Sequence, residues 1–176
     1  MVAVRDCALR REAILEAAWA CFLQHGYAKT SLGDVAREAG VSRPSIYVQF
    51  ANKQALFRSV IESRIDADFA AARDVLRLDL PPRQKLLRLV SVWMLEPLAR
   101  VMGSARGDEV FEQALGIETE LRISYQQRSR ELFAAVLGDS EAAIVLQLAL
   151  KGLLADRPAT ATFRARVELL IGRFVS

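Results

Sequence analysis

One stretch of the chain constrains the fold more than any other: SLGDVAREAGVSRPSIYVQFANK, from Ser31 to Lys53. Ser31 and Asp34 have the spacing of a capping box, in which each side chain bonds a main-chain N–H at the start of a helix. Gly40 suits the end of that helix, because glycine adopts the left-handed conformation without steric cost. The spacing predicts a short helix that begins at about Ser31 and ends before Gly40.

A second short helix follows at once. Ser42 is a good N-cap, and Pro44 fits the first turn, where a missing N–H costs nothing. Ile46 and Phe50 are four residues apart, so both point to the same apolar side. Asn52 then caps a third helix. Two short helices joined by a tight turn form a helix-turn-helix, whose second helix reads the major groove of DNA.

Five residues lie on or beside the outward face of the second helix, namely Arg43, Ser45, Tyr47, Val48 and Gln49, and three of these residue types suit contact with DNA. Arginine pairs with guanine or phosphate, glutamine with adenine, and a tyrosine hydroxyl with phosphate. The same spacing is also compatible with two core helices of an ordinary all-α domain.

Charge and composition agree with a nucleic-acid-binding head. Residues 1–60 hold eight Lys/Arg and five Asp/Glu, whereas residues 61–176 hold sixteen of each, so the net charge of +3 lies with the helix-turn-helix. With 52% hydrophobic residues, no apolar run long enough for a bilayer and no signal peptide, we expect a globular cytoplasmic protein without membrane association. Two cysteines, Cys7 and Cys21, do not make a metal site.

The rest of the chain is helical in pattern. One long helix runs from Lys53 to about Leu78, and Pro81 and Pro82 end it. Further helices are expected over 83–102, kinked or broken at Pro97, and over 109–115, 117–137, 140–155 and from 160 onward. We therefore predict an all-α fold with an N-terminal three-helix DNA-binding head (1–52) and a C-terminal helical bundle (53–176).

The last two helices carry more apolar surface than a small monomer can cover. We expect them to pair with a second copy as a four-helix bundle. The alternative is that they form the core of the monomer. The residues assigned to this dimer interface are Leu146, Leu150, Leu153, Leu154, Phe163, Val167, Leu170 and Phe174.

The N-terminal third also resembles a known family, the TetR-type (tetracycline-repressor-like) regulators. The resemblance covers roughly residues 9–60 and is carried by the run AGVS…SIY..F..K..L together with these positions: Ile14, Ala17, Phe22, Gly26, Tyr27, Thr30, Ser31, Val35, Ala36, Ala39, Gly40, Val41, Ser42, Ser45, Ile46, Tyr47, Phe50, Lys53 and Leu56. Family members are dimeric and use their final two helices for this purpose.

The resemblance implies that a dimer presents two recognition helices to a palindromic operator, about 34 Å apart. The expected DNA-binding residues are Thr30, Ser31, Ser42, Arg43, Pro44, Ser45, Tyr47, Gln49 and Lys53. Three positions depart from the family pattern: Gly33 removes a common base-reading side chain, Pro44 replaces a small residue, and Gln49 replaces a His or Tyr. An operator sequence therefore cannot be borrowed from a relative.

The resemblance further implies a small apolar or aromatic effector among the middle helices. The candidate lining residues are Trp93, Met94, Phe111, Arg122 and Tyr125, although apolar stripes at helical spacing are also ordinary core. No P-loop, G-x-G-x-x-G, H-E-x-x-H or G-x-S-x-G motif occurs, and the single histidine excludes sites that need two. We expect no enzyme activity, cofactor or metal.

Three hypotheses remain. The first is a ligand-responsive repressor, and the second is a DNA-binding regulator without a small-molecule ligand, controlled by a protein partner or constitutive. The third is an α-helical enzyme or interaction module that retains the head as a scaffold.

Overall fold

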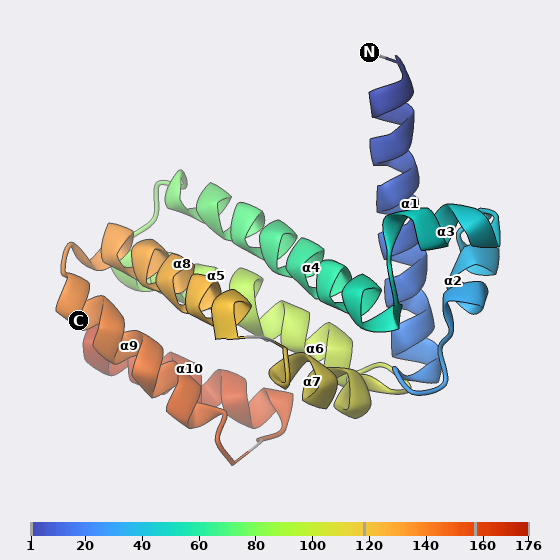
Figure 1. Cartoon of the computed structure of the whole chain (residues 1–176). Helices are drawn as coiled ribbons and strands as arrows, with labels where there is room; N and C mark the ends of the chain where they lie inside the picture. The colour runs from blue at the N-terminus through green and yellow to red at the C-terminus, as the bar shows by residue number, and fades with distance from the viewer. Residues whose placement is uncertain (1, 118, 157, 176) are drawn as a thin grey trace. The chain divides into compact units, whose positions relative to one another are not determined.

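A computed structural model describes residues 2–117, 119–156 and 158–175. Every regular element in these ranges is helical, which confirms the expected all-α fold (Figure 1). In chain order the elements are α1 (Val2–His25), α2 (Leu32–Glu38), α3 (Arg43–Gln49), α4 (Lys53–Leu76), α5 (Pro82–Val90), the π-helix η1 (Ser91–Leu95), α6 (Glu96–Met102), α7 (Gly107–Leu115), α8 (Thr119–Leu137), α9 (Ser140–Leu153) and α10 (Thr160–Phe174).

The helices group into two compact units. Unit 1 comprises residues 1–64 and 100–117, and unit 2 comprises residues 65–99 and 118–176. The predicted long helix is α4, which passes from unit 1 into unit 2 and ends at Leu76. Unit 1 is thus assembled from two separate stretches of chain. The functional boundary between residues 52 and 53 stays a prediction.

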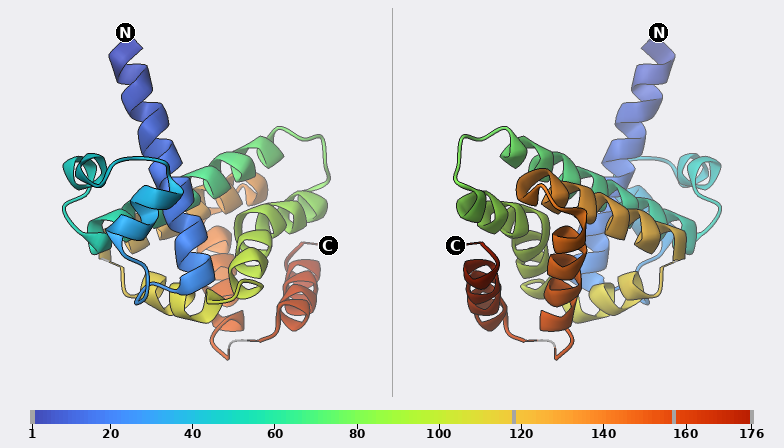
Figure 2. Two further views of the ribbon diagram at one scale, coloured as in Figure 1. Left: turned by 90° about the vertical axis from the view of Figure 1, so that its right-hand side faces the viewer. Right: turned by 90° about the vertical axis from the view of Figure 1, so that its left-hand side faces the viewer.

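Unit 1 has an aromatic centre. The ring of Phe57 meets those of Phe22 and Tyr27 edge-on, with centroids 5.1 and 5.0 Å apart. Val110 of α7 is buried in the same core, which fixes the second stretch of chain to the first. Helix α1 begins at Val2, and its start extends past the other helices of this unit (Figures 1 and 2).

Unit 2 packs α5, η1, α8, α9 and α10 around a second aromatic centre, and α8 lies beside α9 (Figure 2). Its helix after Pro82 does not run straight through. Because Pro97 has no N–H to donate, a regular α-helix would lose a bond there. The chain instead widens into η1, where the Glu96 N–H donates to Ser91 O, and α6 starts afresh. This agrees with the break expected at Pro97.

The assignment of α9 and α10 to a dimer interface needs correction for half of its residues. Leu146, Leu150, Phe163 and Val167 are at most 1% exposed and form part of the core of unit 2. They are therefore monomer core, which was the alternative interpretation. The other four, Leu153, Leu154, Leu170 and Phe174, are partly buried against that core.

Candidate nucleic-acid interface

The start of α2 has the predicted capping box. The Asp34 N–H donates to Ser31 Oγ at 3.2 Å, and the Ser31 N–H donates to Asp34 Oδ2 at 3.1 Å. The Ser31 hydroxyl also donates to the same carboxylate at 2.6 Å. These bonds from Ser31 hold the pKa of Asp34 below its ordinary value. The capping box fixes where α2 begins.

Thr30 is not an exposed DNA-contacting residue, contrary to expectation. Its side chain is 2% exposed, and its hydroxyl donates to Gly26 O at 2.7 Å and lies 3.3 Å from Cys21 O. Both carbonyls belong to the C-terminal end of α1 or the residue after it. Thr30 therefore ties the chain before α2 to α1.

The start of α3 is capped as predicted. Ser42 Oγ accepts the Ser45 N–H at 3.3 Å, and the two hydroxyls are 2.7 Å apart. Pro44 lies in the first turn. Ile46 and Phe50 are buried in the core of unit 1, at 0% and 3% exposure. This anchoring determines which side of α3 faces outward.

The outward side of α3 carries one residue that the sequence analysis did not select for binding. Val48 is 87% exposed, more than any other large apolar side chain among the described residues, and Tyr47 beside it is 58% exposed. Arg43 and Pro44 are also exposed, and Ser45 is half-buried. An apolar side chain at this place can meet a thymine methyl group. The sequence already indicated that Val48 is exposed, because it lies on the side of the helix opposite Ile46 and Phe50.

Gln49 is only half-buried, but its side-chain oxygen is fully enclosed. Oε1 has no hydrogen-bond partner among the described residues. A buried acceptor without a donor costs free energy, so this side chain gains by turning outward when a donor is offered. The N6 amino group of adenine is such a donor.

Lys53 has a structural role within unit 1. Its ammonium group donates to Tyr27 O at 2.8 Å and Ala28 O at 3.1 Å, and it lies 4.5 Å from the centre of the Tyr27 ring. Since an ammonium has three donors, one remains for a phosphate. Lys53 thereby holds the loop between α1 and α2.

The same loop is held from α7 by Glu109. Its Oε1 accepts the Ala28 N–H at 2.7 Å. Gly26 leaves room for this carboxylate, because a Cβ there would collide with Glu109, and the φ of +85° also favours glycine. Arg106 adds a main-chain bond to Leu23 O at 3.1 Å. The sequence held no signal for Glu109, because this contact joins residues that are 81 positions apart.

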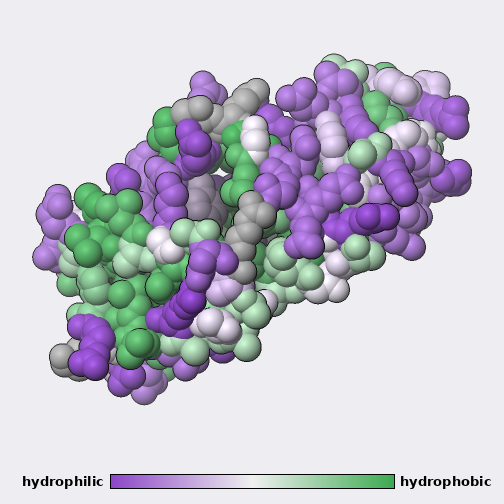
Figure 3. Space-filling view, turned by 90° about the horizontal axis from the view of Figure 1, so that it is seen from below, coloured by the Kyte–Doolittle hydropathy of each residue, from purple (hydrophilic) through white to green (hydrophobic). Residues whose placement is uncertain are grey.

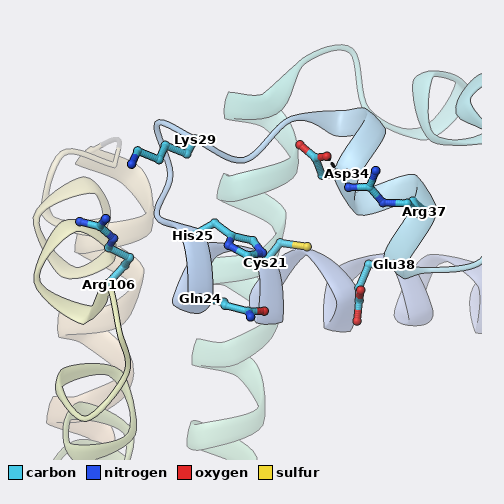
Figure 4. Close-up of a pocket in the computed structure, with 8 residues that line it drawn as sticks. All are labelled: Cys21, Gln24, His25, Lys29, Asp34, Arg37, Glu38 and Arg106. Carbon is cyan, nitrogen blue, oxygen red and sulfur yellow. Dashed lines mark hydrogen bonds and ion pairs between the residues drawn. The ribbon is translucent and has the colours of Figure 1, made fainter.

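A polar hollow of about 410 Å³ is lined by the C-terminal part of α1, by α2, and by Lys29 and Arg106 (Figure 4). Lys29 and Arg106 lie at one end and the Asp34–Arg37 ion pair, 2.7 Å long, at the other. Cys21 lies between these two ends. Burial raises the pKa of its thiol, and the negative charge of Glu38 raises it further. The mixed charges differ from the aromatic lining expected for an effector site. The side chain of Cys7 lies outside the described part of the chain.

The effector candidates are only partly brought together. Trp93 and Tyr125 stack with centroids 5.2 Å apart, and both contact Phe69. Met94 is half-buried and Arg122 is exposed on α8. Phe111 belongs to unit 1, so it is not part of this cluster. Burial raises the pKa of Tyr125. The Trp93 Nε1–H is buried without an acceptor among the described residues.

The described residues contain no helix that is both long and apolar enough to cross a membrane. They also contain no cluster of three or more His, Cys, Asp or Glu side chains placed to hold a metal ion.

Two short capped helices with an anchored inner face and an exposed outer face form a helix-turn-helix, the DNA-contacting element of a class of transcriptional regulators. A family model described as "Bacterial regulatory proteins, tetR family" matches residues 14–60. The chain is 33% identical over 178 residues to the probable HTH-type transcriptional regulator ArpR of Pseudomonas putida, covering 94% of this chain and 80% of ArpR. The chain therefore belongs to the TetR family.

Other similarities are shorter or more distant. The HTH-type transcriptional repressor ComR of Escherichia coli (strain K12) is 44% identical over 64 residues, which cover 36% of this chain but only 30% of ComR. SmeT, the repressor of the multidrug efflux pump SmeDEF of Stenotrophomonas maltophilia, has the same fold. Its TM-score is 0.65 at 22% identity, with 94% of this chain and 88% of SmeT covered.

Proposed function

We propose that this protein is a cytoplasmic homodimeric repressor that binds a palindromic duplex through α3 and is released by a small apolar or aromatic molecule bound in unit 2. The observation that carries the proposal is the outward face of α3. Its exposed side chains belong to a helix that is capped by Ser42 and whose inner side is buried in the core of unit 1. This helix lies within residues 1–60, which carry the excess positive charge. Such a face can enter a major groove without rearranging the core.

The proposed contacts fall into two groups. Ser31, Ser42, Tyr47 and Lys53 contact or position phosphates, and the free donor of Lys53 links a phosphate to the loop at Tyr27 and Ala28. Base edges are met by the remaining exposed or half-buried residues of α3: Arg43, Pro44, Ser45, Val48 and Gln49. Thr30 is left out because its hydroxyl is buried and already bonded.

The proposed dimer uses a different face of α9 and α10 from the one first expected. Val145, Leu148 and Leu169 are 52%, 56% and 65% exposed. Apolar side chains gather over this part of unit 2 in Figure 3. Exposed apolar clusters of this kind mark association sites, and a two-fold pair makes half-sites about 34 Å apart. Leu148→Asp should yield monomers by analytical ultracentrifugation, while the exposed Ile123 on α8 offers a matched control, Ile123→Asp. A dimeric Leu148→Asp variant would contradict this face.

The experiment for DNA binding is selection of duplexes from a random pool, followed by affinity measurements over a range of salt concentrations. Lys53→Ala should lower the salt slope by about one. Lys85→Ala is a matched control, because Lys85 Nζ also donates to a main-chain carbonyl, Leu76 O, but lies in unit 2. A slope unchanged by Lys53→Ala would remove the phosphate contact. Failure to select any duplex would remove the proposed function.

The proposed effector site is the cluster of Trp93, Tyr125, Phe69 and Phe133. The unpaired Trp93 Nε1–H favours an aromatic molecule that carries an acceptor atom. SmeT has been solved as a complex with triclosan, an observation on SmeT that motivates testing halogenated phenols here. Such a molecule releases DNA only if it binds the low-affinity state more tightly.

A second candidate has an observation of its own. Trp93 is 3% exposed and is enclosed by three aromatic rings, as expected for a closed core. This favours a regulator without a small-molecule ligand. A screen of apolar and aromatic molecules for release of the selected duplex separates the two candidates. Release that is weakened by Trp93→Phe supports the effector, and no release by any compound supports the second candidate.

A further inference from the structure

Gly33 of α2 and the guanidinium group of Arg43 lie against each other on the surface of unit 1. A Cβ atom on residue 33 would lie 3.2 Å from Arg43 Nε and 3.3 Å from Cζ and Nη2. At such distances the Arg43 side chain would have to shift by a few tenths of an ångström. The missing side chain at residue 33 therefore makes room for Arg43.

The backbone of Gly33 does not itself require glycine. Gly26, Gly40 and Gly138 have positive φ angles, whereas Gly33 lies within the regular helix α2. Glycine is a poor helix former because it loses the most backbone entropy on folding. The space taken by Arg43 is the physical reason the structure offers for glycine at this place.

The guanidinium group of Arg43 lies next to Gly33 without using its hydrogen-bond donors on the described residues. It is the exposed first residue of α3, and its guanidinium makes no hydrogen bond or ion pair with the described residues. Its donors are therefore available to a ligand. A planar guanidinium fork matches the O6 and N7 acceptors of guanine, and restricting a long side chain beforehand lowers the entropy cost of binding.

We infer that Gly33 determines base specificity without touching DNA: it admits Arg43 onto the surface of α2 and so fixes where the guanidinium meets a guanine. Gly33 is a positioning residue, and Arg43 is the group that reads. The inference rests on the proposed function, because it requires α3 to bind duplex DNA.

A second explanation for Gly33 is that DNA approaches its backbone directly. The two explanations differ in their dependence on Arg43. If Gly33 acts through Arg43, the effect of Gly33→Ala disappears once Arg43 is truncated. If DNA needs the bare backbone, the effect is the same in both backgrounds. A double-mutant cycle therefore decides between them.

The test begins with duplexes selected by the wild-type protein. Equilibrium binding is then measured for wild type, Gly33→Ala, Arg43→Ala and the double variant, on the selected duplex and on duplexes changed at one base pair at a time. Gly33→Ala should weaken binding about tenfold per half-site and lose discrimination at the same base pair as Arg43→Ala. In the Arg43→Ala background it should change affinity by less than about twofold.

Gly172→Ala is the matched control. Its Cβ would lie 3.1 Å from Nη2 of Arg83 in unit 2, so it makes the same replacement beside the same kind of group. Its DNA affinity should equal that of wild type. Thermal melting should show Gly33→Ala at or above wild type, because Arg43 can swing into solvent and alanine favours the helix. Arg43→Lys keeps the charge but not the planar fork, so it should weaken discrimination at that base pair.

The outcomes are distinguishable. Wild-type affinity and base preference in Gly33→Ala would overturn the inference, as would an equal loss in both Arg43 backgrounds. If the wild-type protein selects no duplex, the proposed function fails and this inference fails with it. That result is recognised from the wild-type measurement alone.

Discussion

Removal of the Glu109 carboxylate is expected to loosen the loop between α1 and α2. In the structure, Glu109 Oε1 accepts the Ala28 N–H at 2.7 Å, while Lys53 holds the carbonyls of Tyr27 and Ala28. Glu109→Ala removes the acceptor from one side and leaves the lysine bonds on the other. The loop should therefore open more often without being lost from the fold.

The magnitude follows from the geometry. A hydrogen bond to a charged group contributes about 1.5–3 kcal/mol, but Ala28 is exposed and Glu109 is half-buried, so water replaces part of the bond. We expect a loss of about 1 kcal/mol and, for a chain of this size, a fall in Tm of about 2–4 °C. Amide hydrogen exchange gives the local measurement: protection of the Ala28 N–H should fall by about fivefold.

Two variants serve as comparisons. Glu109→Gln keeps an oxygen that can accept the same N–H, so it should lose less than half of the effect. Glu131→Ala removes a carboxylate of α8 that, among the described residues, accepts only from the Gln127 side chain at 3.2 Å, and its Tm should change little. If hydrogen exchange at Ala28 is the same in Glu109→Ala and wild type, the carboxylate does not hold the loop and the reasoning fails.

Three further substitutions test the interface. Thr30→Val should cost about 1–2 kcal/mol in urea unfolding, because Gly26 O loses its buried donor, whereas Thr30→Ser should stay near wild type. Gln49→Met should raise stability by up to about 1 kcal/mol, since it removes a buried oxygen without a partner, and should weaken DNA discrimination at one base pair. A less stable Gln49→Met would indicate that the oxygen has an unseen donor. The pKa of Asp34 is lowered in the folded state, so its contribution is present above the ordinary value of 3.8 and is lost as pH falls below it. Asp34→Asn should flatten this acid-side loss of stability, and identical pH profiles would exclude the role of the carboxylate.

The helix-turn-helix could be predicted closely because its signals are local. Ser31 and Asp34 interact three residues apart, and Ser42 caps the second short helix as expected. The helix end before Gly40 and the helix break at Pro97 could also be predicted, because glycine and proline affect the backbone in the same way in any chain. Such features do not depend on distant parts of the chain.

The predictions that were wrong depend on contacts between residues far apart in the sequence, or on a choice between two similar apolar faces of a helix. The position of Thr30 next to the recognition helices suggested exposure, but α1 supplies the carbonyls that bury it. α9 is apolar on most sides, so periodicity alone could not tell whether Leu146 or Val145 faces outward; the structure shows 0% and 52% exposure. The aromatic cluster included Trp93 and Tyr125 as expected but not Phe111, because α7 packs with unit 1.

The split construction of unit 1 has a consequence for protein engineering. The recognisable family segment ends at residue 60, and a chimera built from that segment alone would be designed as if it carried the whole reading head. Such a transplant would omit Glu109 and Val110, which hold the loop at Ala28 and complete the apolar core. A graft that exchanges operator preference between relatives should therefore carry residues 100–117 along with residues 1–64. The unit that would have to be transferred is therefore made of two separate stretches of the sequence.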